Sequence, residues 1–261
     1  MKTGTQALDS CLRGNDTLNA IVLAAGVGKR FGKRTQKLPK CLIPLGQTGN
    51  GLLVRYLDAF RKNKLRDITL VVGHEKEQII SAALRHGKGL SIRCVENKRY
   101  TEGSLVSLYT ARDVLSSGPT LVMDADVFFP PALLGKLIRS SKPSAFLYDP
   151  RSKSAGEEMM LMGKAGCPLA ISKQVEPSLK ILGEATGIVK WSSLHGKKIA
   201  AILTQFVQKE TTRVEYEEAY DVLLKKEKIG LVPVGSVFWS EMDFEEDLKK
   251  ISGRLRSPAA A

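Results

Sequence analysis

The sequence predicts a single α/β domain in which helices cover both faces of a mainly parallel, mixed central sheet, as in an α/β/α sandwich. Three observations support this prediction: a length of 261 residues, a hydrophobic content of 43%, and short apolar runs that alternate with amphipathic segments. The length corresponds to one large domain or two small ones, and the hydrophobic content suffices for a substantial core. Alternation of strand and helix is typical of right-handed βαβ crossovers, which make neighbouring strands parallel.

The first half of the chain shows this alternation most clearly. Apolar runs predict strands at 20–25, 68–72, 92–95 and 120–123. Apolar residues at helical spacing predict helices near 52–60, 75–85 and 105–115. The first of these runs contains apolar residues only, as expected of a strand that is buried on both faces of the sheet.

The second half of the chain predicts the mixed part of the sheet. Strand-like runs follow one another there with few helices between them, at 145–148, 159–162, 169–172 and 187–191. The remaining segments predict helices at 194–208, 216–226 and 244–251 and a strand at 230–234. We expect one domain at 18–252, with flexible extensions at 1–17 and 253–261.

Composition argues against several classes of protein. No stretch reaches the roughly 18–20 apolar residues that span a bilayer, and the first residues lack the apolar core of a signal peptide. We therefore expect a cytoplasmic protein without a membrane partner. The 4 cysteines and 3 histidines lack zinc-ligand and CxxC spacing, which argues against a structural metal or a redox dithiol.

The charge of the chain is strongly basic. Forty Lys and Arg residues against 27 Asp and Glu residues give a formal net charge of +13. Such an excess favours anionic partners, which include nucleic acid, an anionic membrane surface and phosphorylated small molecules. The distribution of the charge must decide between them.

A basic segment with two glycines follows the first predicted strand. Six basic residues and no acidic residue lie between positions 29 and 40, namely Lys29, Arg30, Lys33, Arg34, Lys37 and Lys40. Gly26 and Gly28 at the end of a strand allow backbone N–H groups to approach an anion, and the cations suit a polyphosphate. Pro39 fixes the backbone before Lys40. The spacing excludes a Walker A loop and a dinucleotide fingerprint.

A solvated basic loop or a nucleic-acid patch is the alternative interpretation of this segment. A nucleic-acid site would alternate aromatic with basic residues, whereas Phe31 is the only aromatic residue here. We therefore expect no nucleic-acid partner.

The run Leu23-Ala24-Ala25-Gly26-Val27-Gly28-Lys29-Arg30, followed by Pro39-Lys40 before an apolar stretch, resembles the signature of the NTP-transferase (nucleotidyltransferase) superfamily. The resemblance is tight from Ile21 to Leu45 and extends through later landmarks to Leu248. It implies a GT-A-like, Rossmann-like fold in which the glycine loop wraps the triphosphate of an NTP. The residues it implies for nucleotide binding are Leu23, Ala24, Ala25, Gly26, Gly28 and Lys29, with Arg30 and Lys40 as catalytic cations.

An Asp-x-Asp pair ends the predicted strand at 120–123. Asp124 and Asp126 then lie at the carboxyl edge of the sheet, beside the glycine loop. Carboxylates suit Mg²⁺, which usually binds through one or two of them together with substrate phosphates. The alternative is an N-cap of a helix near Pro130. The family resemblance assigns Asp126 to Mg²⁺, with Asp124 as a second ligand.

A third landmark is the segment Trp239-Ser240-Glu241-Met242-Asp243, with Glu245-Glu246-Asp247-Leu248 after it. It resembles the late segment of the same superfamily, whose first aspartate supplies another metal carboxylate. By position this residue is Asp243. Asp243 can also cap the final helix, with Glu246 completing a capping box, and both roles can hold together.

The middle of the chain indicates the substrates. Glu102 and Ser104 open a predicted helix that resembles the nucleotide-binding segment of cytidylyltransferases acting on phosphocholine or 2-aminoethylphosphonate, and we expect Ser104 to cap this helix. The run Gly183 to Gly187 matches a turn of the family. Candidate acceptor-binding residues are acidic or aromatic: Asp149, Glu184, Glu215, Tyr216 and Glu217. Such side chains attract an ammonium group.

We therefore expect a Mg²⁺-dependent enzyme that transfers CMP from CTP to a small phosphorylated alcohol or phosphonate. A sugar-1-phosphate nucleotidyltransferase using UTP, GTP or dTTP is the first alternative. A non-catalytic basic protein that binds nucleic acid or acts in regulation is the second. The sequence is compatible with a homodimer and does not name the acceptor.

Overall fold

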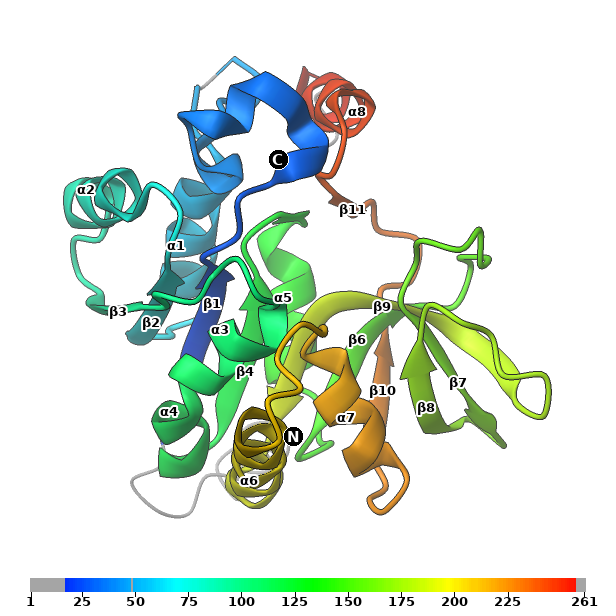
Figure 1. The fold of residues 1–261 in the computed structure, drawn as a ribbon. Coiled ribbons are helices and arrows are strands. Elements are labelled where there is room, and N and C mark those ends of the chain that lie inside the picture. Colours follow the sequence, from blue (N-terminus) through cyan, green and yellow to red (C-terminus); the bar gives the residue numbers. More distant parts are fainter. Residues whose placement is uncertain (1–16, 48, 257–261) are drawn as a thin grey trace, which may run out of the picture.

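The computed structural model describes residues 17–47 and 49–256 of the chain. Its main sheet has the strand order β10–β6–β9–β4–β1–β2–β3 (Figure 1). These strands are, in chain order, β1 (Asn19–Ala24), β2 (Asp67–Val72), β3 (Ser91–Glu96), β4 (Thr120–Asp124), β6 (Ala145–Asp149), β9 (Lys180–Trp191) and β10 (Gly230–Pro233). All neighbours pair in parallel except β9, which is antiparallel to both β4 and β6.

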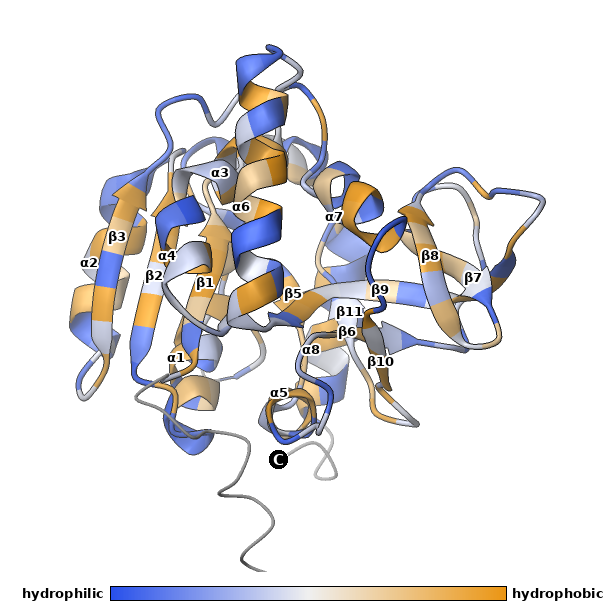
Figure 2. Cartoon of the chain, turned by 90° about the horizontal axis from the view of Figure 1, so that it is seen from below, coloured by the Kyte–Doolittle hydropathy of each residue, from blue (hydrophilic) through white to orange (hydrophobic). Residues whose placement is uncertain are grey.

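The central strands are buried on both faces because their side chains alternate between two cores. In β1, Ala20 and Val22 belong to one core, whereas Ile21 belongs to the other. Figure 2 shows hydrophobic residues along β1 and β2, whereas the surrounding helices carry both hydrophobic and hydrophilic residues. The continuous apolar runs in the sequence therefore predicted these strands correctly.

Helices cover each face of the sheet. The first core lies under α1 (Leu52–Lys62), α2 (Lys76–His86), α5 (Pro131–Ile138) and α8 (Glu245–Arg256). The second core lies under α3 (Ser104–Thr110), α4 (Arg112–Ser117), α6 (Ser193–Gln208) and α7 (Glu217–Leu224). The predicted α/β sandwich with a mainly parallel, mixed sheet is confirmed.

Two smaller β-structures accompany the main strands. The hairpin of β7 (Met160–Lys164) and β8 (Cys167–Ser172) pairs with β9 and projects to the right in Figure 1. The short strands β5 (Val127–Phe128) and β11 (Ser240–Glu241) form a separate antiparallel pair. This pair joins a late segment of the chain to the end of β4, where the candidate metal carboxylates lie.

Three expectations about local structure need correction. The predicted helix at 105–115 is two helices, α3 and α4, because the backbone leaves helical geometry at Ala111. The predicted turn from Gly183 to Gly187 lies inside β9. There Gly187 has φ 68°, a left-handed conformation that glycine adopts without strain, close to a shift in the β6–β9 register.

The predicted tail at 253–261 begins inside α8, which continues to Arg256. Leu255 packs against the first core, next to Gly46, and this contact explains why the helix extends beyond residue 252. The rest of that tail, and the predicted extension at 1–17 apart from Thr17, lie outside the described residues. Within the described part of the chain, no helix combines the length and the apolarity needed to cross a membrane.

Candidate active site

The ends of β1 and β4 bring the two early motifs together. These strands pair in parallel, with Leu23 opposite Asp124, so the glycine loop and the Asp-x-Asp pair leave the sheet side by side. Gly28 has φ 66° and precedes the 3-10 helix at Lys29–Gln36. The Thr35 hydroxyl donates a hydrogen bond of 2.8 Å to the Gly28 carbonyl and thereby closes the loop.

Lys40 lies between two carboxylates that come from distant parts of the chain. Its Nζ donates to Asp126 Oδ2 at 2.7 Å and to Asp243 Oδ1 at 2.6 Å. Arg30 Nη1 donates to the other oxygen of Asp243 at 2.7 Å. We call Arg30, Lys40, Asp126 and Asp243 the paired cluster.

The paired cluster favours the charged forms of Lys40 and Asp243. Burial by itself would lower the pKa of Lys40, but the adjacent carboxylates of Asp126 and Asp243 outweigh this effect and raise it. Burial would likewise raise the pKa of Asp243, but Lys40 and Arg30 hold it below its ordinary value. These charges therefore persist at neutral pH.

A second group of acidic residues lies further along the same cavity. We call Asp124, Glu215, Glu217 and Glu241 the acidic cluster. Burial is the main cause that raises the pKa of Asp124 well above its ordinary value, with Asp126 and Glu217 contributing. Burial also raises the pKa of Glu217, and together with Asp126 and Asp243 it raises the pKa of Glu241 to about 8. The charged forms of Asp124, Glu217 and Glu241 are therefore disfavoured, chiefly because these carboxyl groups are shielded from water.

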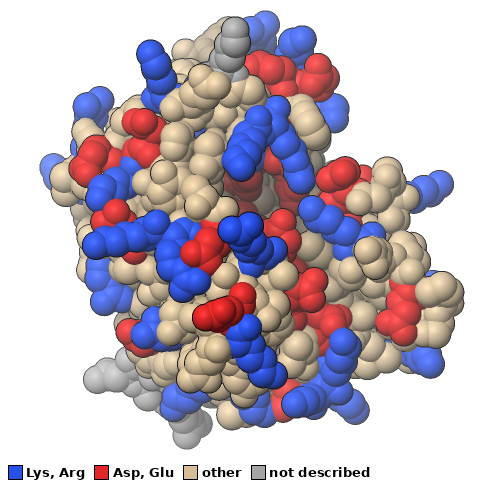
Figure 3. Space-filling model, viewed as in Figure 1, with Lys and Arg blue, Asp and Glu red and all other residues tan. Residues whose placement is uncertain are grey.

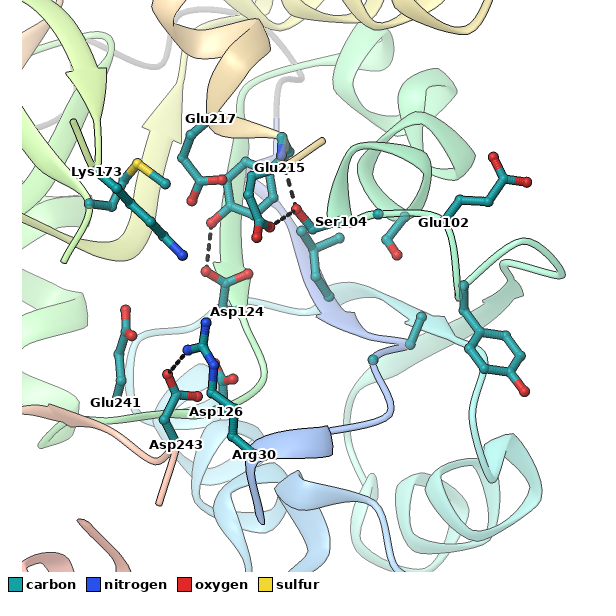
Figure 4. A pocket seen from close by; sticks show the side chains of 18 of the residues that line it. Arg30, Glu102, Ser104, Asp124, Asp126, Lys173, Glu215, Glu217, Glu241 and Asp243 are labelled. Carbon is teal, nitrogen blue, oxygen red and sulfur yellow. Dashed lines mark hydrogen bonds and ion pairs between the residues drawn. The ribbon is translucent and has the colours of Figure 1, made fainter. Parts of the chain in front are cut away.

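The acidic cluster lines one cavity of about 330 Å³ together with Arg30, Asp126 and Asp243 of the paired cluster. Figure 3 shows acidic side chains in the central hollow of this face and basic side chains around its rim. In Figure 4, Arg30 and Asp243 face each other at one end, and Lys173 points inward from the opposite side. Further lining residues are Leu23, Ala25, Gly26, Tyr100, Glu102, Ser104 and Tyr216. A smaller cavity of about 100 Å³ beside it is lined by Ala24, Gly26, Gly28, Pro39 and Lys40.

Ser104 connects two segments and does not cap α3, contrary to our expectation. Its hydroxyl donates to Glu215 Oε2 at 2.7 Å and accepts the Tyr216 N–H at 2.9 Å. The first helical position belongs to Ser104, and the Leu105 N–H at this helix end is bound by the Val214 carbonyl. The loop before α7 therefore satisfies the N-terminus of α3.

The hydroxyl of Tyr216 in turn donates to Asp124 Oδ2 at 2.6 Å. A β-carbon on Gly187 would lie 2.5 Å from the same oxygen, so the glycine in β9 leaves room for this carboxylate. Asp124 is thus held by a tyrosine rather than by the cations of the paired cluster.

Four of the predicted site residues either lie outside the cavities or have a side chain that other residues already bind. Lys29 is exposed and lines neither cavity. Glu102 lines the larger cavity, but hydrogen bonds from Arg99 and Thr212 hold its carboxylate and lower its pKa to about 2. Asp149 is 5% exposed and, like its neighbour Glu184 on β9, does not line the cavity.

The alternative capping roles of the aspartates are not observed. The N–H groups of Asp243 and Phe244 donate to Asp247, at 3.2 and 3.0 Å, so Asp247 takes the place expected for Glu246. The side chain of Asp243 is engaged with Lys40 and Arg30 instead. The residue before α5 is Pro130, and therefore neither Asp124 nor Asp126 is its N-cap.

Several lining residues were missed in the sequence. Glu241 stands two positions before Asp243, and the period of two of an extended segment could have placed both on one side. Lys173 follows β8, and Tyr100 follows β3; neither belongs to a motif that we identified. Their positions depend on how the β7–β8 hairpin and the loop after β3 fold over the sheet.

Asp126 and Asp243 fit a divalent cation. Their oxygens lie 2.7 and 2.6 Å from the same ammonium nitrogen, so the two carboxylates converge closely enough to share one cation. In the described part of the chain, no three acidic, histidine or cysteine side chains form a complete metal site. Mg²⁺ takes few protein carboxylates and completes its coordination with phosphate and water, so these two residues would suffice to hold it.

Comparisons with curated proteins find cytidylyltransferases. A choline-phosphate cytidylyltransferase of Haemophilus influenzae is 30% identical over 194 residues, which cover 72% of this chain and 75% of that protein. A 2-aminoethylphosphonate cytidylyltransferase of Lancefieldella rimae is 33% identical over 121 residues, or 45% of this chain. The match spans 47% of the Lancefieldella protein, about half its length.

Comparison with solved structures supports the fold. The CTP:phosphocholine cytidylyltransferase of Streptococcus pneumoniae superposes with a TM-score of 0.74 at 21% identity, covering 92% of this chain and 100% of that one. A family model described as the MobA-like NTP transferase domain matches residues 20–198. This range covers more than half of the chain and includes the glycine loop, Lys40 and the Asp-x-Asp pair. The protein therefore belongs to the family of MobA-like NTP transferases, as the resemblance to nucleotidyltransferases predicted.

Proposed function

We propose that the protein is a Mg²⁺-dependent cytidylyltransferase that transfers CMP from CTP to a small phosphorylated alcohol or phosphonate and releases pyrophosphate. The acceptor would carry an ammonium group, as phosphocholine and 2-aminoethylphosphonate do. The observation that carries this proposal is a cavity lined by Gly26, Arg30 and the acidic cluster, beside a smaller cavity lined by Gly28 and Lys40. The activities of the two cytidylyltransferases that the chain resembles support it.

The paired cluster suits the nucleotide. Backbone N–H groups near Gly26 and Gly28 can approach a triphosphate, and Arg30 and Lys40 supply positive charge beside them. Asp126 and Asp243 would hold Mg²⁺, which when bound would neutralise charge on the phosphates. Because Lys40 is 13% exposed and follows the rigid Pro39, its charge is preorganised.

The acidic cluster suits the cationic part of an acceptor. Burial disfavours the charged forms of Asp124, Glu217 and Glu241, and an ammonium group beside them would favour those forms by supplying a neighbouring positive charge. Tyr216 adds an aromatic ring, which also attracts a quaternary ammonium ion. Lys173 points into the same region and could meet the phosphate or phosphonate of the acceptor.

The proposed reaction needs no general base. The attacking phosphate or phosphonate oxygen is already negatively charged at neutral pH, so the obstacle is repulsion between two anions. Positive charge and alignment overcome this obstacle. We therefore propose direct in-line displacement at the α-phosphorus, with pyrophosphate as the leaving group and no covalent intermediate. None of the three histidines, His74, His86 and His195, should be essential.

Pyrophosphate release tests the proposal. The purified protein would be assayed with each of CTP, UTP, GTP and dTTP, paired with phosphocholine, 2-aminoethylphosphonate and glucose 1-phosphate. We expect release with CTP and one of the two ammonium-bearing acceptors. Release only with a sugar 1-phosphate would identify the sugar-1-phosphate reaction instead, and no release with any pair would remove the enzymatic proposal.

A further inference from the structure

Asp149 makes a contact that lies outside the cavity and joins two distant segments. At the end of β6, its Oδ2 accepts the indole N–H of Trp239 at 2.9 Å. Arg151 donates to both carboxylate oxygens, at 2.7 and 2.9 Å. The Asp149 side chain is 8% exposed, whereas that of Arg151 is 53% exposed. Because Trp239 is only partly exposed, its bond to Asp149 is better shielded from water than the bonds from Arg151.

Trp239 begins a short segment that ends at the paired cluster. The next two residues form β11, which pairs with β5. The Met242 N–H then donates to the Asp126 carbonyl at 2.9 Å, and the Met242 side chain is fully buried. Asp243 follows directly and binds Lys40 and Arg30. Residues 239–243 are thus fastened at one end by Asp149 and at the other by Lys40.

This arrangement has a mechanical consequence. Asp126 and Asp243 come from different segments, and β11 contributes only two residues to its pairing with β5. Such a short pair holds its position weakly by itself. The additional, partly buried hydrogen bond between Trp239 and Asp149 restricts how far Glu241 and Asp243 can shift relative to Asp126.

We propose that Asp149 and Trp239 are positioning residues for Asp243: their hydrogen bond holds the segment 239–243 so that the carboxylate of Asp243 meets Lys40, Arg30 and Asp126. Neither residue touches the cavity, so their effect on the reaction passes through Asp243. Two experiments test this role, and only the one that measures nucleotidyl transfer rests on the proposed function.

A double-mutant cycle separates positioning from general stabilisation. Trp239→Phe removes the indole donor and should lower kcat about tenfold, the effect expected from losing one partly buried hydrogen bond that aligns a residue of the active site. In the background of Asp243→Asn, the same substitution should change the residual kcat less than twofold, because a residue that acts through Asp243 has nothing left to position. KM for CTP should change less than kcat.

Arg151→Ala is the matched control. It removes the exposed partner of Asp149 and leaves the indole bond in place, so kcat should stay within about twofold of wild type. Asp149→Ala removes the acceptor from the other side and serves as a second variant if Trp239→Phe folds poorly. An equal loss of kcat from Trp239→Phe with and without Asp243→Asn would overturn the proposal, as would an unchanged kcat in both Trp239→Phe and Asp149→Ala.

Hydrogen exchange gives a measurement that does not depend on the reaction. In Trp239→Phe without any ligand, peptides covering 240–243 should lose protection at the Met242 amide, while peptides covering β6 stay protected. Unchanged protection at 240–243, or loss confined to β6, would contradict the positioning role. If the wild-type protein transfers no nucleotide, the proposed function fails, and the exchange experiment still decides the role of Trp239.

Discussion

The paired cluster and the acidic cluster lie next to each other in the candidate active site but differ in how their charges are balanced. In the paired cluster, Lys40 and Arg30 contact Asp126 and Asp243 directly, at 2.6 to 2.7 Å. In the acidic cluster, the carboxylate of Asp124 is bound by a neutral hydroxyl and that of Glu215 by Ser104. Carboxylates are thus bound by cations in the first region and by hydroxyl groups in the second.

This difference shows how one active site can bind both the anionic phosphates of a nucleotide and the cationic group of an acceptor. Ion pairs favour the charged forms of Lys40 and Asp243, so the positive charge of Lys40 is present for phosphates. Burial, with smaller contributions from neighbouring carboxylates, raises the pKa of Asp124, Glu217 and Glu241, so that region gains from an incoming cation. The assignment of nucleotide and acceptor to the two regions follows from this contrast.

The largest expected effect is at Lys40. Lys40→Met should fold normally but lower kcat about a thousandfold, because preorganised charge beside the reacting phosphorus is worth several kcal/mol of barrier. Steady-state kinetics with CTP and the best acceptor would measure this. Lys164→Met, which removes an exposed lysine outside both clusters, is the control. Near-wild-type kcat in Lys40→Met would remove Lys40 from the mechanism.

The two carboxylates of the paired cluster should behave as one unit. Asp126→Asn and Asp243→Asn should each lower kcat about a hundredfold and raise the Mg²⁺ concentration needed for half-maximal activity. The double variant should be scarcely worse than either single variant, because the first substitution already disables the shared site. Additive losses, or activity that persists in excess chelator, would contradict a shared metal.

Changes in the acidic cluster should affect the acceptor selectively. Glu217→Gln removes one carboxylate and should raise KM for the ammonium-bearing acceptor about tenfold, with KM for CTP nearly unchanged. Glu218→Gln, on the exposed side of α7, is the control and should change neither constant. Equal changes in both KM values in Glu217→Gln would show that the two regions do not divide the substrates.

The smallest effect concerns a carboxylate that is ion-paired outside the cavity. Hydrogen bonds from Arg151 and Trp239 lower the pKa of Asp149 to about 2, below the roughly 3.9 of an unfolded chain. Its ionised form therefore stabilises the fold above about pH 5, and this contribution is lost as the pH falls toward 2. The difference in free energy of unfolding between wild type and Asp149→Asn, from denaturant titrations, should shrink over that range; a constant difference would contradict the assignment.

The sequence predicted the paired cluster better than the acidic cluster, for a physical reason. Arg30 and Asp126 lie in compact motifs just after β1 and β4, which pair side by side, and Lys40 follows in the same basic segment as Arg30. The environment of Glu241 and Lys173 depends on the β5–β11 pair and the β7–β8 hairpin, which join distant segments. Asp149 was predicted as acceptor-binding because its acidity is visible in the sequence, whereas its bond to Trp239 spans 90 residues and is not.

The contrast between the two regions is tested most directly by acceptors that differ only in charge. The ratio of kcat/KM would be measured for 2-aminoethylphosphonate against propylphosphonate, and for phosphocholine against 3,3-dimethylbutyl phosphate, in which carbon replaces the cationic nitrogen. The wild-type protein should prefer one cationic acceptor over its neutral isostere by about a hundredfold, the cost of leaving buried carboxylates without their partner. Glu217→Gln should reduce this ratio. A ratio near one for both pairs in the wild-type protein would contradict the account.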